Sequence, residues 1–511
     1  MSTITPLLRI KERIVGPSGI YNIQNEWYGY ADEFKYTIGL AGLMGFGVGC
    51  CPPELLPADT APLPGTEDRF SPNYGTYIHL PSASIQCFIP AHYMDVQSPG
   101  NTNAPFYGSK IVISSTQSGD AVLPKAFQND GGELAGVFVD KYQGSNCRPD
   151  GSGLPNSTTG APGELPNAGG IFASRPLHWP VSAVGIDGTL NSPFSLCDSD
   201  ALNAAITVAP ANNLGGAWQL CKTRGADFAP MPIWIRGQIA FLSLAHAQAL
   251  LDTNGDPIAG ATTNAAWMDV APYAPKGNNN NAAADVNKTS LRFDRTDIAG
   301  HASGRAGRNH RAFTGAAWIG SVLTPAVEHT THNGQLSGIV DVNGNQWDTT
   351  PGLTCVGTGA GDFRLFPASG DWTATSSNTS ITGEAGVISL VAETAPGDDD
   401  GVWWAEAATN HFLVPHADGT FHPSSGFSDA TLRAMTECLL PRELGTSGTQ
   451  TSTNILGGDR FRSRRINNML PRVGGDWGSG ATAGVFSVLL GTGATTTFSD
   501  LGARAVRLLS A

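Results

Sequence analysis

The C-terminal segment from residue 472 onward constrains the fold more than any other part of the chain. It contains two adjacent glycines, Gly474 and Gly475, followed closely by Trp477. Glycine permits close backbone approach or a positive φ, and tryptophan supplies a large apolar anchor. This combination predicts a strand that packs tightly against its neighbour.

Small residues flank an apolar stretch within this segment. Residues 478–482 and 491–497 are Gly, Ala, Ser and Thr, whereas 485–490 is mainly Val, Leu and Phe. Small side chains cannot fill a core, so we expect the apolar stretch to be buried and the small residues to form an exposed face. Runs of Gly, Ser and Thr are also typical of plain loops, and these two runs alone leave both interpretations open.

The composition predicts many irregular connections and little helix. Of 511 residues, 63 are Gly and 34 are Pro, and only 14% are charged. This length suits roughly two or three ordinary domains or one large loop-rich domain. A formal net charge of −13 argues against a nucleic-acid partner, because phosphate binding relies on clustered Lys and Arg.

The cysteines and the N-terminus indicate neither a metal module nor a membrane protein. The eight cysteines show no Cys-x-x-Cys spacing, so buried free thiols are expected. The N-terminus lacks the pattern of a signal peptide, and no apolar run approaches about eighteen residues. We therefore expect synthesis in a cytoplasm and no membrane insertion.

Residues 1–70 differ in character from the rest of the chain. The stretch 10–21 is compatible with a strand pair or an extended arm, and 30–43 is mildly amphipathic. The prolines that follow Cys51 indicate a linker. We expect 1–70 to be an N-terminal attachment arm with a Pro-rich linker, and 71–511 to form the main domain.

Three segments carry clear periodicity. Residues 84–93 and 136–142 alternate apolar and polar side chains, which predicts strands. Residues 232–251 place apolar side chains on one face at helical spacing, which predicts an amphipathic helix. His246 lies on that apolar stripe, so it is expected to be a hydrogen-bonded core histidine rather than a ligand.

Two further local signals concern a cap and a turn. Asp198 and Asp200 predict a capped helix over 201–208. Asn343-Gly344 is a strong type I′ turn signal just before Trp347.

Four segments, in the correct order, resemble one superfamily. They are the Ile-Pro-Ala corner at 89–93, the strand ending in Asp-Lys-Tyr at 136–142, Gly-Ile-Val-Asp-Val-Asn-Gly-Asn-Gln-Trp-Asp at 338–348, and the closing motifs within 472–504. They are similar to segments of the C-type-lectin-like fold shared by formylglycine-generating enzymes and the variable proteins of diversity-generating retroelements.

The resemblance implies a fold class and a framework. It implies an α+β, loop-rich C-type-lectin-like domain over 71–511, with an insertion at about 355–465 that elaborates the binding face or a subunit contact. The framework residues that it implies are Gly474, Gly475, Trp477, Phe486, Arg504 and Trp347.

This sequence lacks the catalytic residues of the enzymes in the superfamily. Formylglycine-generating enzymes use paired cysteines in the closing segment, and 474–504 contains no cysteine. The related sulfoxide-forming enzymes need a His-x-x-x-His-x-Glu helix, and His411, His416 and His422 have different spacing. No catalytic residue is predicted, and an oxidoreductase or other enzyme on the same scaffold stays a third hypothesis that requires a metal.

Structural calcium is the one metal that the sequence leaves open, and no other cofactor is expected. Asp252–Asp256 begins like an EF-hand loop, but Thr263 stands where the loop needs Glu. Asp398–Asp400 and Asp341 with Asn343 offer further oxygen ligands. A solvated acidic turn is the alternative at each place.

In the retroelement variable proteins, diversified residues share one face of the scaffold. The corresponding display face of this chain, with two tryptophans of the insertion, is predicted to bind a ligand: Gly478, Ser479, Ala481, Thr482, Ser487, Gly491, Thr492, Thr495, Thr496, Ser499, Trp403 and Trp404. The family often has Asn or Tyr in such slots, and small side chains offer little aromatic anchoring. The chain is thus either a non-diversified relative with structural duty or takes its contacts from the insertion.

The sequence therefore predicts a bacteriophage virion protein, a tail fibre or receptor-binding component, located on the tail or particle surface. Its expected partners are a host cell-surface protein or glycan, other virion proteins through the N-terminal segment, and copies of itself, a trimer being common among fibre and spike proteins. The alternative is a structural virion protein, a head or baseplate decoration, that uses the same fold for assembly.

Overall fold

The structure is a computed structural model, and it describes part of the chain. The described residues are 22–26, 35–97, 110–117, 119–129, 132–157, 159, 170–181, 213–250, 314, 316–319, 322–325, 330–356, 362–365, 388–392, 402–403, 433–434, 436–440, 460–463, 469–476, 483–491, 493 and 501–509. Sheets predominate among them and helices are few, so the fold is a β-rich member of the expected α+β class. Among these residues, no helix is both long and apolar enough to cross a membrane.

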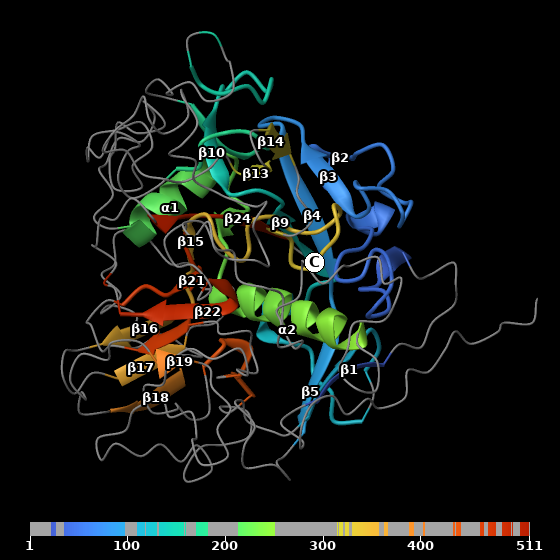
Figure 1. Ribbon diagram of the computed structural model, residues 1–511, viewed down its shortest axis with the longest axis vertical. Helices are drawn as coiled ribbons and strands as arrows, with labels where there is room; N and C mark the ends of the chain where they lie inside the picture. The colour runs from blue at the N-terminus through green and yellow to red at the C-terminus, as the bar shows by residue number, and fades with distance from the viewer. Residues whose placement is uncertain are drawn as a thin grey trace, which may run out of the picture.

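Six antiparallel strands form the first large sheet, in the order β12-β24-β9-β4-β3-β2 (Figure 1). The strands are β2 (Thr60–Pro62), β3 (Thr76–His79), β4 (Ser84–Pro90), β9 (Gly136–Asp140), β12 (Phe228–Pro230) and β24 (Ala505–Leu508). β4 and β9 confirm the strands predicted at 84–93 and 136–142. β24 lies between β9 and β12, so the closing segment forms part of the sheet interior.

The second large sheet is mixed and has the order β19-β20-β22-β21-β15-β23. Its strands are β15 (Trp347–Thr349), β19 (Val402–Trp403), β20 (Arg460–Ser463), β21 (Arg472–Gly474), β22 (Gly484–Leu490) and β23 (Leu501–Gly502). β15 pairs with both β21 and β23. The closing motifs and the tryptophan of the 338–348 segment are therefore neighbours, although more than a hundred residues separate them in the sequence.

Smaller elements surround the two sheets. One three-stranded sheet has the order β1-β6-β5, another joins β16, β17 and β18, and three strand pairs complete the set. The elements are β1 (Asn22–Glu26), β5 (Tyr93–Gln97), β6 (Lys110–Ser114), β7 (Gln128–Asn129), β8 (Gly132–Glu133), β10 (Gly144–Cys147), β11 (Ile171–Ser174), β13 (Ala316–Ile319), β14 (Val322–Pro325), β16 (Leu353–Val356), β17 (Asp362–Leu365), β18 (Ile388–Ala392), the 3₁₀ helices η2 (Pro53–Leu55) and η3 (Lys125–Phe127), and the α-helices α1 (Asn213–Lys222) and α2 (Ile233–Ala249).

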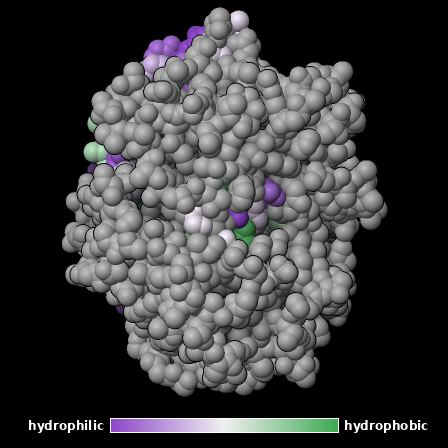
Figure 2. Space-filling view, turned by 90° about the vertical axis from the view of Figure 1, so that its left-hand side faces the viewer, coloured by the Kyte–Doolittle hydropathy of each residue, from purple (hydrophilic) through white to green (hydrophobic). Residues whose placement is uncertain are grey.

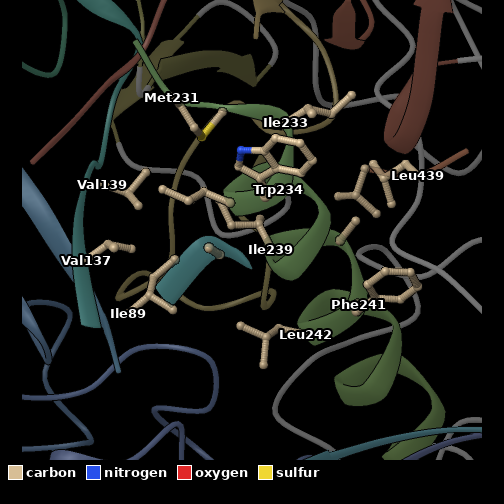
Figure 3. Packing of buried hydrophobic residues seen from close by; sticks show 14 of the residues in the cluster. Ile89, Val137, Val139, Met231, Ile233, Trp234, Ile239, Phe241, Leu242 and Leu439 are labelled. Carbon is tan, nitrogen blue, oxygen red and sulfur yellow. The ribbon is translucent and has the colours of Figure 1, made fainter. Parts of the chain in front are cut away.

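Helix α2 is the centre of the hydrophobic core. It matches the helix predicted over 232–251, but its side chains from Ile233 to Ala247 are all buried, so the expectation of a single apolar face is wrong. Figure 3 shows the reason. Val137 and Val139 of the first sheet lie on one side of α2, whereas Leu439 lies on the other. A helix covered on both sides has no solvent-facing polar face. The polar side chains of α2, which include Arg236, Gln238 and His246, are therefore buried as well.

His246 is a core residue, as predicted. The backbone N–H of Gly42 donates a hydrogen bond to its Nδ1 at 3.0 Å, and the ring stacks on Phe46 with centroids 5.4 Å apart. Burial lowers the pKa of His246 to about 3, so the ring is neutral at physiological pH.

The first seventy residues do not form a separate arm where they are described. Ile38, Phe46 and Val48 belong to the main core, and β2 is a strand of the first sheet. Three of the prolines predicted to form a linker belong to regular elements instead, because Pro52 and Pro53 lie at the start of η2 and Pro62 lies in β2. The predicted boundary at residue 70 is therefore wrong, because apolar residues before it supply core volume. Residues 1–21 lie outside the described residues.

The predicted insertion at 355–465 also reaches the core. Cys438, Leu439 and Leu440 are buried in the main cluster, and β20 pairs in parallel with β22. The Glu437 carbonyl approaches Gly237 of α2 so closely that a side chain at 237 could not fit. The described parts of this segment thus support the scaffold. The helix predicted at 201–208 lies outside the described residues.

Asn343-Gly344 does not form the predicted type I′ turn, because that turn needs a positive φ at both positions and Asn343 has none. Positive φ occurs instead at Asp341, Gly344 and Asn345. The segment is an irregular, wholly buried stretch before β15, and Asp341 and Asn345 in it bind side chains of other segments rather than each other across a hairpin.

Candidate functional site: the closing segment and its buried framework

Two stretches of the predicted display face lie between fixed anchors. Residues 477–482 connect β21 to β22, which are antiparallel neighbours, and 494–500 precede β23. The stretches themselves are outside the described residues, and with them Trp477, Gly478, Ser479, Ala481, Thr482, Thr492, Thr495, Thr496, Ser499 and Trp404. Trp403 is described only as part of the backbone of β19.

The anchors of these stretches are β21, β22 and β23. β21 and β22 lie on the left of the molecule in Figure 1, and β23 pairs with β15 of the same sheet. Figure 2 views the molecule from that side. At the middle of this face the described residues that reach the surface are both hydrophilic and hydrophobic, and at the upper edge they are mostly hydrophilic.

Ser487 does not belong to an exposed face, and this part of the prediction is wrong. It lies in β22, all seven residues of which are buried. Ser487 is buried with its apolar neighbours because β22 is covered on both faces, and a strand in that position has no solvent-facing side. Gly491 lies at the end of β22 and is half-buried.

Phe486 and the paired glycines occupy structural positions. Phe486 is fully buried and meets Phe241 of α2 edge-on, with ring centroids 5.9 Å apart. Gly474 and Gly475 have φ of +95° and +93°, a region that favours glycine. A Cβ added at Gly474 would lie 3.0 Å from the carbonyl oxygen of Val342. The chain therefore turns out of β21 in a conformation that a larger residue would strain.

Arg504 is fully buried and joins three parts of the chain. Its Nη1 donates to the carbonyl oxygens of Asp140 at 2.8 Å and Lys141 at 3.0 Å, and its Nη2 donates to that of Val340 at 2.7 Å. Its Nε donates to Oδ2 of Asp348 at 3.2 Å. The guanidinium thus fixes the connection between β23 and β24 to the end of β9 and to the 338–348 segment.

Asp348, the counter-charge of Arg504, has a second partner. Nε2 of Gln143 donates to Asp348 Oδ1 at 3.2 Å and to the carbonyl oxygen of Gln346 at 2.9 Å. Oε1 of Gln143 accepts from Asn345 Nδ2 at 3.1 Å. Both carboxylate oxygens of Asp348 are therefore bonded in the interior, as a buried charge requires.

A second buried ion pair lies at the end of β9. Nη1 and Nη2 of Arg224 donate to the two carboxylate oxygens of Asp140 at 2.6 Å and 2.5 Å, and both side chains are fully buried. The backbone N–H of Ala505 also donates to Asp140 at 3.2 Å. Asp140 therefore holds the start of β24 through its side chain, while its carbonyl oxygen binds Arg504.

Trp347 is buried in a smaller apolar cluster beside the second sheet, and the guanidinium of Arg472 lies 5.7 Å from its ring centroid. A cation over an indole face is stabilising. Leu489 and Leu501 belong to the same cluster. Trp347 thus packs between the strands that precede and follow the display stretches.

Sequence reasoning missed several of these residues. Asp140, Gln143 and Arg224 were not singled out, although Asp140 is the first residue of the Asp-Lys-Tyr motif. Arg224 lies far from the closing segment in the sequence and has no local signal. Arg224 could have been found only by asking which cation neutralises Asp140, an aspartate at the end of a buried strand.

One hydrogen-bonded chain has the residue types of a hydrolase triad. Oγ of Ser82 is 2.7 Å from His79 Nδ1, and His79 Nε2 is 3.3 Å from Asp59 Oδ2. Ser82 and His79 are fully buried, and burial lowers the pKa of His79. Asp59 also binds Arg507 of β24 at 2.6 Å. These hydrogen bonds connect β24 to the segment before β2. Because Ser82 is fully buried, they provide no accessible nucleophile.

Metal-ligating groups are dispersed in the described part of the chain, which contains no cluster of three or more His, Cys, Asp or Glu able to hold an ion. Asp341, a suggested calcium ligand, accepts a hydrogen bond from Thr314 Oγ1 at 2.8 Å. The other suggested ligands, Asp252–Asp256 and Asp398–Asp400, lie outside the described residues, as do His411, His416 and His422. The six cysteines whose side chains are described are buried free thiols, as predicted.

The chain matches no protein-family model, and no curated protein shows significant similarity to it. The arrangement of buried and anchoring residues is therefore the basis for the proposals that follow.

Proposed function

We propose that the protein is a bacteriophage virion protein, a tail-fibre or receptor-binding component, with a C-type-lectin-like fold that displays a ligand-binding surface. The surface comprises the exposed residues of 478–482 and 491–499, and Trp403 and Trp404 are assigned to its border. Its ligand is a protein or glycan on the host cell. No cofactor takes part in binding, and calcium has at most a structural role.

The observation that carries the proposal is the buried framework around Arg504. Three of its four described hydrogen bonds go to backbone carbonyl oxygens, so these bonds do not depend on the identity of the side chains at the positions that they join. The paired glycines set where one stretch leaves β21. Binding residues are typically carried on loops held by a rigid scaffold, and this arrangement fits that principle.

The resemblance to the retroelement variable proteins supplies the functional class. Its framework positions Gly474, Phe486 and Arg504 all occupy buried places in the second sheet or beside it. Burial of these residues is what a display scaffold needs.

Binding of purified, labelled protein to candidate host cells tests the proposal. We expect saturable binding by the wild type and its loss in a variant with Ser479, Thr482, Thr492 and Thr496 each replaced by Arg. Ser487 is left unchanged because it is buried. The matched control replaces two exposed residues of the same chemistry, Ser152 and Thr159, by Arg and should bind normally.

The outcome also tests the structural alternative. If the wild type does not bind cells but is incorporated into isolated heads, tails or baseplates, the result would favour a structural virion protein over a receptor-binding protein. Equal loss in the display variant and in the control would show that added positive charge, rather than the display surface, governs binding.

A further inference from the structure

Several exposed apolar side chains come from one stretch of the chain. Six large apolar residues are exposed among the described residues, and four of the six lie between residues 43 and 80. The six are Leu43, Leu55, Phe70, Leu80, Leu154 and Leu336. Scattered apolar residues are normal on a surface, but a group of them indicates an interaction site.

Three of these residues come from loops that meet. Nε2 of Gln335 donates to the carbonyl oxygen of Leu43 at 3.1 Å, and Oε1 of Gln335 accepts from the N–H of Gly45 at 2.7 Å. An added Cβ at Gly45 would lie 3.2 Å from Cβ of Arg69, the residue before Phe70. The loops that carry Leu43, Phe70 and Leu336 are thus held together, and these residues are 46%, 67% and 38% exposed.

Charges of both signs border this group. Nζ of Lys35 and Oε2 of Glu67 are 2.8 Å apart, and the guanidinium of Arg69 lies 5.1 Å from the ring centroid of Phe70. Asp68 accepts a hydrogen bond from the N–H of Phe70 at 3.0 Å. Arg69 and Asp68 thus contact Phe70, which is 67% exposed, and the Lys35–Glu67 pair lies at the start of the same loop.

We propose that this surface, hereafter the Phe70 surface (Leu43, Phe70, Leu336, Lys35, Glu67, Asp68 and Arg69), is the contact between copies of this chain. A two-fold contact places the same surface on both partners, so the surface must complement itself. The Phe70 surface does so, because its cations on one copy can face its carboxylates on the other while the apolar residues meet at the centre.

The overall charge favours a copy of the chain at this surface over other faces. The formal net charge is −13, so two copies repel each other wherever their acidic faces meet. The balanced signs of the Phe70 surface reduce that repulsion at the point of contact. Aromatic residues with a nearby arginine are also the types enriched at the centres of interfaces.

The position of the surface leaves the display stretches accessible. Residues 35–80 occupy the right-hand side of the molecule in Figure 1, whereas β21 and β22 lie on the left. Association through the Phe70 surface therefore keeps the anchors of the display stretches away from the contact. The inference does not depend on the proposed ligand, because self-association is measured without one.

Sedimentation equilibrium of the full chain over a range of concentrations tests the proposal. We expect the wild type to associate reversibly, and Phe70→Ala to weaken the association constant by about 30-fold, the loss typical of an aromatic hot spot. Leu336→Glu should also shift the chain towards monomer. Leu154→Glu is the matched control, because Leu154 is 43% exposed but lies outside the Phe70 surface, and it should associate like the wild type.

Each outcome decides the matter. A wild type that stays monomeric at all concentrations overturns the proposal, and so does association that Phe70→Ala and Leu336→Glu leave unchanged. Loss of association in both variants, with unchanged circular dichroism and a normal Leu154→Glu control, supports it. Cell binding by a monomeric variant would separate this inference from the proposed receptor-binding role.

Discussion

Replacement of Arg504 by Met is the sharpest test of the framework. The substitution keeps an unbranched side chain in the fully buried site but removes the charge and the four hydrogen bonds. It leaves Asp348 in the interior with Gln143 as its remaining described side-chain donor. The Lys141 carbonyl oxygen keeps a second donor, the N–H of Val340 at 2.8 Å, so part of the network survives.

The expected loss is large on the scale of protein stability. Removal of one partner of a buried ion pair costs about 3–5 kcal/mol, because the other charge stays buried without compensation. A domain is stable by only about 5–15 kcal/mol in total. With a urea m value of about 3 kcal/mol/M, the midpoint of unfolding should fall by about 1–2 M.

Equilibrium urea unfolding, followed by tryptophan fluorescence, measures this loss. The control is Arg507→Met, whose partners Asp59 and Asp227 are substantially exposed, so that no fully buried charge is left behind and we expect a smaller loss than for Arg504→Met. Adding Asp348→Asn to Arg504→Met should recover part of the stability, because it removes the uncompensated charge. A loss below about 1 kcal/mol for Arg504→Met would refute the assigned role.

Two further substitutions test single features. Burial raises the pKa of Glu437 from 4.5 to about 7, so the folded state binds the proton more tightly than the unfolded state and stability falls as pH rises from about 4.5 to 7. Glu437→Gln should remove about 3 kcal/mol of this pH dependence, measured by urea titrations at pH 5 and pH 8. An unchanged difference in stability between the two pH values would contradict the prediction. Gly474→Ala should cost about 1–3 kcal/mol through its positive φ and the nearby Val342 carbonyl. Its control is Gly119→Ala, which has φ +57° but open space around the added carbon, and an equal loss in both would exclude the contribution of the close contact.

Periodicity predicted those strands and helices whose pattern is contained in their own residues. β4, β9 and α2 follow from alternation and from helical spacing in their own residues. The position of His246 in the core followed from the apolar residues around it in the helix. The side-chain pattern thus located these elements. It did not show which sides are buried, because every residue of β9 and every residue from 233 to 247 of α2 is buried.

Prediction failed where burial depends on distant parts of the chain. The strand around Ser487 has covers on both faces, and neither cover is visible in its own sequence. Asn343-Gly344 has a hairpin signal, but the buried segment takes its polar partners from elsewhere: Arg236 donates to the carbonyl of Val342, and Gln143 binds Asn345. Residues 38–48 enter the core although the prolines beyond them suggested a linker.

The kind of bond that Arg504 makes explains how such a scaffold could tolerate variation in its display stretches. A guanidinium bound to backbone carbonyls requires only that the backbone of β9 and of the 338–348 segment keep its path. Substitution at 478–482 or 491–499 should therefore change binding far more than stability, whereas substitution at Ser487, inside a strand covered on both faces, should mainly change stability. A display surface is distinguished from its support by whether substitutions mainly change binding, as expected at 478–482 and 491–499, or mainly change stability, as expected at Ser487.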